Sequence, residues 1–157
     1  MKLIFKNSLG EKILSGTGEG PFGITEISGL GIVPYERQCY TSYDFDGTIE
    51  SARRIPGRNI TIAGDIKGTS RDVKDFLKLM SEPFSMTVEE DGVKRTAYVS
   101  MATSKTSRVS ENITKFALSL VLDDPYFYDE EETKVALFVR EKLLSKKVTS
   151  AEITAAR

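Results

Sequence analysis

The fold class is decided by residues 84–101, whose sequence is FSMTVEEDGVKRTAYVSM. Apolar and polar side chains alternate on both sides of Asp91-Gly92, and such alternation is the pattern of a half-buried strand. An Asp-Gly pair between two alternating runs is the strongest short-range signal for a hairpin. The segment therefore predicts two antiparallel strands with one face in the core.

The sequence just before this hairpin predicts a helix. Four apolar residues fall at helical spacing, namely Val73, Phe76, Leu77 and Met80. They form a single apolar stripe and predict a helix over about residues 70–80. Thr69 with Asp72 three residues later matches a capping box at the start of this helix. Glu82-Pro83 ends it, because proline cannot continue a helix.

Other alternating runs predict strands on both sides of the helix, over residues 2–6, 11–15, 22–28, 38–45, 60–66 and 116–122. Strands, one helix and further strands make an α+β, mostly β domain, a β-sandwich-like fold with several hairpins rather than a doubly wound one. We expect this domain to span residues 1–130. Residues 131–157 form a C-terminal extension or linker, in which 132–146 fits a helix and 136–139 fits an edge strand equally well.

The composition excludes several classes of function. The 22 Lys and Arg nearly balance the 23 Asp and Glu, which argues against a dedicated nucleic-acid-binding protein. The 157-residue chain has no histidine and one cysteine, Cys39, so an internal disulfide, a zinc site of Cys and His ligands and a Ser-His-Asp triad cannot form. Cys39 lies in an alternating run, which predicts a small buried side chain. No apolar run is long enough for a membrane span, and we expect neither export nor membrane insertion.

Two motifs match known catalytic or nucleotide-binding patterns in residue type and spacing, but not in their structural context. Residues 44–48, DFDGT, resemble the nucleophile motif of haloacid-dehalogenase-like phosphatases, with Asp123-Asp124 and Lys115 as possible accessory groups. That nucleophile follows a buried parallel strand, whereas residues 38–42 are polar and alternating, so a hairpin turn is favoured. Residues 18–23 match G-x-G-x-x-G, but no strand precedes and no helix begins there, which indicates a loop.

A local group of basic residues begins at Arg53-Arg54 and Arg58. Residues that could extend it are Arg37, Arg71, Lys74 and Lys78. Because the total charge is close to zero and no aromatic residues interleave with Arg53, Arg54 and Arg58 as stacking platforms, a solvated face or a charged subunit interface is favoured over a nucleic-acid site.

Two stretches resemble a known family. Residues 53–62, RRIPGRNITI, are similar to the I-P-G-R segment of the distal tail proteins of siphophages, and residues 116–129, FALSLVLDDPYFYD, resemble the strand ending in D-P-Y that closes their N-terminal domain. The helix and the Asp91-Gly92 hairpin lie between them in the family's order. Many members continue into a second, galectin-like domain, which would begin about where this sequence ends, so the resemblance fits either a short, ring-only member or part of a longer protein.

The resemblance implies a β-sandwich that assembles as a hexameric ring and connects the tail tube to the baseplate or receptor-binding apparatus. Its partners would be further copies of the chain, the tail tube protein, the tape-measure protein and a tail-associated lysin or fibre hub. It implies no catalytic, cofactor or metal site and no enzymatic activity. It places the chain in the virion tail, assembled in the bacterial cytoplasm. Arg58 and the 53–59 turn would be interface or fold-determining positions.

Segments with few apolar residues in a core-forming pattern are candidates for contact between copies in such a ring. They are the hydroxyl-rich run at 38–45 and the glycine-rich segment at 16–31. An alternative function is a stand-alone β-sandwich module that binds carbohydrate or protein, for which residues 126–128, Tyr-Phe-Tyr, beside Asp123-Asp124 would supply the aromatic and acidic side chains.

Overall fold

A computed structural model describes residues 1–44 and 46–129 of the chain. The alternatives predicted for 132–146 and 136–139, and the extension at 131–157, lie outside the described residues. The elements in chain order are β1 (Lys2–Asn7), β2 (Gly10–Ser15), β3 (Phe22–Ser28), β4 (Glu36–Tyr40), β5 (Ile49–Arg54), β6 (Arg58–Lys67), α1 (Ser70–Met80), β7 (Phe84–Glu90), β8 (Val93–Val99), β9 (Met101–Ser110), β10 (Ile113–Leu122) and β11 (Tyr128–Asp129).

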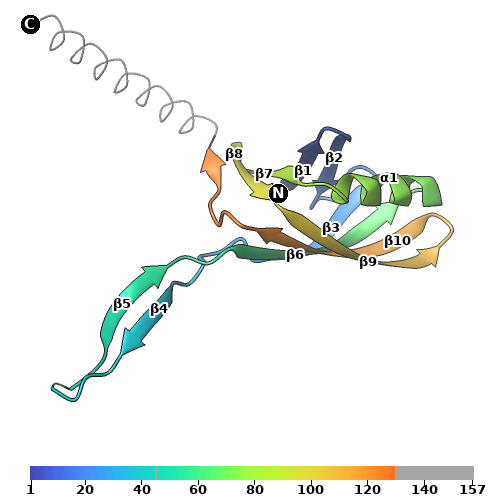
Figure 1. Cartoon of the computed structure of the whole chain (residues 1–157). Helices are drawn as coiled ribbons and strands as arrows, with labels where there is room; N and C mark the ends of the chain where they lie inside the picture. Colours follow the sequence, from blue (N-terminus) through green and yellow to red (C-terminus); the bar gives the residue numbers. More distant parts are fainter. Residues whose placement is uncertain (45, 130–157) are drawn as a thin grey trace, which may run out of the picture.

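Nine of these strands form one sheet in the order β11-β8-β7-β1-β2-β3-β6-β10-β9, and β4 pairs with β5 in a separate two-stranded sheet. All neighbours are antiparallel except β2 and β3, which share a single parallel pair, Ser15 opposite Gly23. At this weak joint the sheet bends, and its two parts lie over one another in two layers (Figure 1). The prediction of an α+β, mostly β fold is confirmed.

The core lies between the two layers because each alternating strand turns one face inward. In β10, Phe116, Leu118 and Leu120 are buried, and β6 places Gly64, Ile62 and Ile60 directly opposite them. The other layer contributes the buried side chains Leu3, Phe5, Leu14, Phe84, Met86, Ala97 and Val99 to the same cluster. Described residues include no helix long and apolar enough to cross a membrane.

Helix α1 begins and ends where its sequence predicts. The Asp72 carboxylate accepts a hydrogen bond from the Thr69 backbone N–H (2.7 Å), and the Thr69 side chain faces the Asp72 backbone, which is the predicted capping box. The Thr69 hydroxyl also donates to the Asp72 carboxylate (3.0 Å). These bonds hold the pKa of Asp72 below its ordinary value. Phe76 is fully buried, and its ring lies 5.1 Å from that of Phe22 and 5.3 Å from that of Phe116, measured between centroids. The helix is thereby fixed to the inner face of β3 and β10.

The β4–β5 hairpin projects away from the sandwich (Figure 1), and we call residues 31–56 the arm. The strand predicted at 38–45 is only partly correct, because β4 begins at Glu36 and ends at Tyr40, before the loop around Asp44 and Gly47. Cys39 is exposed, so its predicted burial is wrong. The physical reason is that the arm is a single layer of two strands with no second layer to cover either face.

Candidate interaction site at the root of the arm

Two backbone segments connect the arm to the sandwich, and both approach another strand so closely that a side chain does not fit. Gly29 has φ +90°, and a Cβ there would lie 2.2 Å from the Asn59 carbonyl oxygen. A Cβ on Gly57 would lie 2.8 Å from the Leu122 carbonyl oxygen. Glycine permits both approaches because it has no Cβ, and at position 29 it also tolerates the positive φ. The arm therefore leaves the sandwich along a path set by backbone contact.

Arg58, the first residue of β6, binds the segments around this path together. Its Nη1 donates to the carbonyls of Gly29 (3.1 Å) and Leu30 (2.9 Å), and its Nε donates to the carbonyl of Pro125 (2.9 Å). Its guanidinium carbon lies 5.1 Å from the centre of the Phe127 ring, within the range of a cation–π contact. Partial burial lowers the pKa of Arg58, yet a guanidinium stays charged in proteins.

These contacts define a root cluster of six residues: Gly29, Leu30, Gly57, Arg58, Pro125 and Phe127. The two motifs that carried the family resemblance, Ile55-Pro56-Gly57-Arg58 and Asp124-Pro125-Tyr126, thus meet at one place. The predicted importance of Arg58 has a structural reason here. The turn predicted at 53–59 is shorter than expected, because β5 continues to Arg54 and only residues 55–57 connect it to β6.

The chain after Pro125 is held by a compact turn, and we call residues 124–129 the exit segment. The Asp124 carboxylate accepts a hydrogen bond from the Tyr126 backbone N–H (3.1 Å) and one from the Tyr128 hydroxyl (2.5 Å). The second bond raises the pKa of Tyr128 above its ordinary value. The exit segment ends in β11, which pairs with β8 over two residues. Asp124, considered above as an accessory group of the phosphatase-like motif, is here a turn-forming residue.

The charged residues of the arm are arranged in pairs. Glu50 lies 2.7 Å from Arg53 Nε and 3.7 Å from Arg37 Nη1, and Arg54 Nη2 lies 2.7 Å from Glu36. The hydrogen bond between Glu50 and Arg53 lowers the pKa of Glu50 and raises that of Arg53. The arginines of the arm are therefore partly neutralised by its own acids.

The predicted basic cluster does not form as one surface. Arg37 and Arg53-Arg54 lie on the arm, Arg58 lies in the root cluster, and the remaining members, Arg71, Lys74 and Lys78, belong to α1. Arg37 does extend the group, since it lies opposite Arg53 in the β4–β5 pair, whereas the residues of α1 do not, because the arm and α1 occupy different parts of the molecule (Figure 1).

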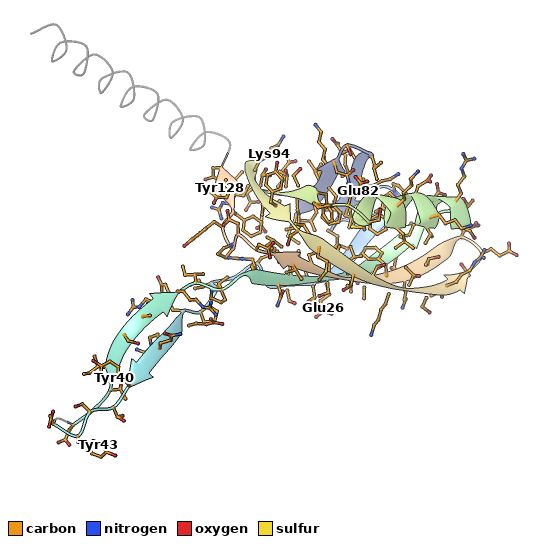
Figure 2. The ribbon with its side chains drawn as sticks, in the orientation of Figure 1. Glu26, Tyr40, Tyr43, Glu82, Lys94 and Tyr128 are labelled. Carbon is orange, nitrogen blue, oxygen red and sulfur yellow. The ribbon has the colours of Figure 1, made fainter. Side chains whose placement is uncertain are left out.

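Large apolar side chains of the arm project into solvent. Ile32 is 99% exposed, and Tyr43 is fully exposed at the far end of the arm (Figure 2). Tyr35 and Tyr40 are more than half exposed, although the Tyr35 ring receives the Arg53 guanidinium at 5.1 Å. Exposed apolar groups gathered on a projecting element are typical of a protein interaction surface.

The motifs that indicated chemistry lie in loops. Asp44 and Asp46 are exposed in the loop between β4 and β5, which agrees with the turn interpretation. Residues 18–23 form the loop between β2 and β3 and the start of β3, with Gly18 and Gly20 at positive φ, so no helix begins there. Lys115 lies on β10, in a different element. Residues 1–44 and 46–129 contain no group of three or more His, Cys, Asp or Glu side chains that could hold a metal ion.

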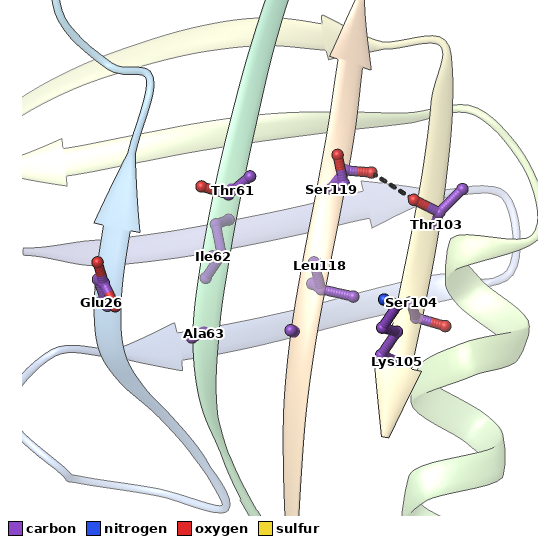
Figure 3. A pocket seen from close by; sticks show the side chains of 10 residues that line it. Glu26, Thr61, Ile62, Ala63, Thr103, Ser104, Lys105, Leu118 and Ser119 are labelled. Atoms are coloured by element: carbon purple, nitrogen blue, oxygen red, sulfur yellow. Dashed lines mark hydrogen bonds between the residues drawn. The ribbon is translucent and has the colours of Figure 1, made fainter. Parts of the chain in front are cut away.

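The outer face of β3, β6, β10 and β9 contains a hollow of about 320 Å³ (Figure 3). Its floor includes Ala63 and Ala117, and Glu26 and Lys105 lie on opposite sides of it.

No protein-family model matches the chain, and no curated protein matches it. Among solved structures, the chain is similar to the Dit protein of phage SPP1, described as a paradigm of the hub adsorption apparatus of phages that infect Gram-positive bacteria. The identity is 18%, the TM-score is 0.53, and the match covers 68% of this chain and 46% of that one.

A second similar structure is the baseplate of phage P2 in its activated conformation with Ca, at 14% identity and a TM-score of 0.61. That match covers 77% of this chain and 43% of the other. The chain thus spans less than half the length of either protein that it matches. At these identities the likeness concerns the fold, and the chain shares its fold with phage tail-hub and baseplate proteins.

Proposed function

We propose that the chain is a structural component of a phage tail, where it forms a homo-oligomeric ring, a hexamer, between the tail tube and the baseplate or receptor-binding apparatus. The observation that carries this proposal is the arm, which exposes large apolar side chains to solvent. The root cluster connects the arm to the sandwich through the hydrogen bonds of Arg58. A projecting element with an apolar surface is suited to contact with a neighbouring subunit. The shared fold with phage hub and baseplate proteins supports the same conclusion.

The edges of the sheet support a ring in particular. Strand β9 ends the nine-stranded sheet, and all but one of its ten residues are exposed. In the same layer, β3 pairs with β2 at one position only, so most of its far edge is open within the described part of the chain. A layer with two open edges on opposite sides can pair β9 of one copy with β3 of the next. Such head-to-tail contacts are heterologous, and they form a closed ring when the rotation between successive copies closes.

In this arrangement the arm reaches the neighbouring copy and covers its own exposed apolar side chains there. The candidate surfaces at 38–45 and 16–31 agree with this proposal, since the first belongs to the arm and the second includes the β2–β3 loop and β3. The further partners are the tail tube protein, the tape-measure protein and a tail-associated lysin or fibre hub. The role is structural rather than enzymatic, and the ring belongs to the virion tail, assembled in the bacterial cytoplasm.

Sedimentation velocity of arm variants tests the proposal. Ile32→Ser and Tyr43→Ser remove apolar surface from the arm without touching the core, and each should raise the concentration needed for assembly by roughly tenfold or more if it acts as an interface anchor. The matched control is Tyr98→Ser, which removes an aromatic ring 72% exposed on β8 of the sandwich. Equal behaviour of all three variants and the parent would count against the arm as the contact surface. A chain that stays monomeric throughout would instead favour a stand-alone binding module.

A further inference from the structure

We infer that Arg58 is a latch that couples the arm to the exit segment, so that the orientation of the arm and the position of residues 124–129 change together. The inference deepens the proposed function, on which its biological meaning rests: the arm contacts the next copy, and the exit segment leads to the chain beyond residue 129. A displacement at either place would then be transmitted to the other through one side chain.

The hydrogen bonds of Arg58 reach both connections at once. Nη1 holds the backbone on which the arm begins, at Gly29 and Leu30, and Nε holds the exit segment at Pro125. The donors of a guanidinium are fixed in one plane, so moving one set of acceptors reorients the donors that serve the other. Lysine has a single nitrogen on a flexible stem and cannot hold both sets in a fixed relation.

The Phe127 ring adds a second contact from the exit segment. It lies against the Arg58 guanidinium at 5.1 Å and is itself half-buried against the core. The exit segment therefore contacts Arg58 both through a carbonyl and through an aromatic face. A shift of this segment changes the position of the guanidinium through both contacts.

Strand pairing does not join the arm to the exit segment within the described residues. The arm strands β4 and β5 pair with each other and with no strand of the sandwich. Strand β11 is two residues long, and its pairing with β8 is accompanied by the ion pair between Arg95 and Asp129 at 3.4 Å. The close approach of Gly29 to Asn59 holds the root of the arm, and the packing of Phe127 against the core holds the exit segment. The Arg58 guanidinium contacts both, so its contacts help to fix the two parts relative to each other.

The test uses Cys39, the only cysteine of the chain, which is exposed on the arm. Nitroxides on Cys39 and on a cysteine introduced as Glu82→Cys, an exposed sandwich position (Figure 2), report the arm-to-sandwich distance in the full chain diluted with unlabelled chain. Arg58→Lys should widen the distance distribution about twofold or more. In the same variant, amide exchange of residues 124–129 should accelerate about tenfold or more.

Phe127→Leu is the second variant, which keeps an apolar side chain and all three hydrogen bonds of Arg58. It changes a side chain of the exit segment and none of the arm, and it should nevertheless widen the distribution measured at the arm. The matched control is Arg108→Lys, since Arg108 also donates to backbone carbonyls, those of Ser110 and Glu111, at the far end of β9. Slow exchange of the β6 and β10 amides verifies that each variant is folded.

An unchanged distribution in Arg58→Lys, or a response of the arm without the exit segment, would overturn the latch, as would an unchanged arm in folded Phe127→Leu. The distance is measured within one chain, so it is available whether or not copies assemble. A monomeric chain would contradict the proposed ring and leave this test intact.

Discussion

Replacing Gly29 with alanine tests whether the arm is fixed to the sandwich by close backbone contact. The substitution adds one methyl group at a position where the backbone has φ +90° and where that methyl would lie 2.2 Å from the Asn59 carbonyl oxygen. Ordinary contact begins near 3.4 Å, so the two strands must separate by more than 1 Å or the root of the arm must change its path.

The expected cost combines two contributions. A residue with a Cβ in the left-handed region costs about 1–2 kcal/mol, and forcing an extra methyl group against packed backbone costs about 1–3 kcal/mol. Gly29→Ala should therefore lower the free energy of unfolding by about 2–5 kcal/mol, out of the roughly 5–15 kcal/mol typical of a domain. Two other glycines separate the contributions. Gly47 has φ +108° with open space around it, and Gly31 has open space and no positive φ.

Urea unfolding followed by circular dichroism measures all three variants. Gly47→Ala should cost about 1–2 kcal/mol at most, from backbone strain alone, and Gly31→Ala should lie within about 0.5 kcal/mol of the parent. If Gly29→Ala unfolds within about 0.5 kcal/mol of Gly31→Ala, the close approach of Gly29 to Asn59 is not part of what holds the arm.

Three further predictions concern the sandwich and the exit segment. Phe76→Ala should lower the free energy of unfolding by about 3–5 kcal/mol, since a buried ring between two others leaves a cavity, and calorimetry should show the lower melting temperature. Because the folded pKa of Asp72 lies below its ordinary value of 3.8, its contribution to stability is present above that pH and is lost as pH falls through the lowered pKa. Asp72→Asn should abolish this part of the pH dependence in acid unfolding curves, and an unchanged curve would contradict the capping role. The pKa of Tyr128 is raised above its ordinary value of 10.0, so its contribution is present below pH 10 and is lost as pH rises through the raised pKa. Ultraviolet titration should show one phenol ionising late in the parent and none such in Asp124→Asn.

The parts of the fold that local sequence predicts are those where one face is buried and the turn is marked. The Asp91-Gly92 hairpin, the capped helix and the alternating run at 116–122 all appear as expected, because burial imposes a period and the turn residues fix the ends. The predicted apolar stripe on α1 omitted Leu79, which is buried beside Phe76 and Met80.

Strand β9 was not predicted, and the reason is its place at the edge of the sheet. Its residues that lie on the same side as the buried Phe116 and Leu118 of β10 are Thr106 and Ser104, so no apolar alternation marks the strand. Likewise, β5 contains Arg53-Arg54 and was interpreted as a turn with a basic cluster. A strand exposed on both faces shows no alternation of apolar and polar residues, and its charged residues indicate only a solvent-exposed surface.

The root cluster shows a different limit. Arg58 was singled out from the I-P-G-R motif, but its partners Pro125 and Phe127 are distant in sequence, and no local pattern indicates that they meet. The glycine at position 29 carried a weak signal as part of a glycine-rich segment. That signal predicted a loop and not the close approach of two backbones that the position requires.

The central claim is that copies of this chain assemble into a closed ring through the arm and the open sheet edges. Native mass spectrometry of the full chain over a range of concentrations tests it most directly. The account predicts one dominant species at six times the 17.4 kDa mass of the chain, without a ladder of larger species, since a closed ring has no free edge left. A single species at 17.4 kDa at the highest concentration would contradict it.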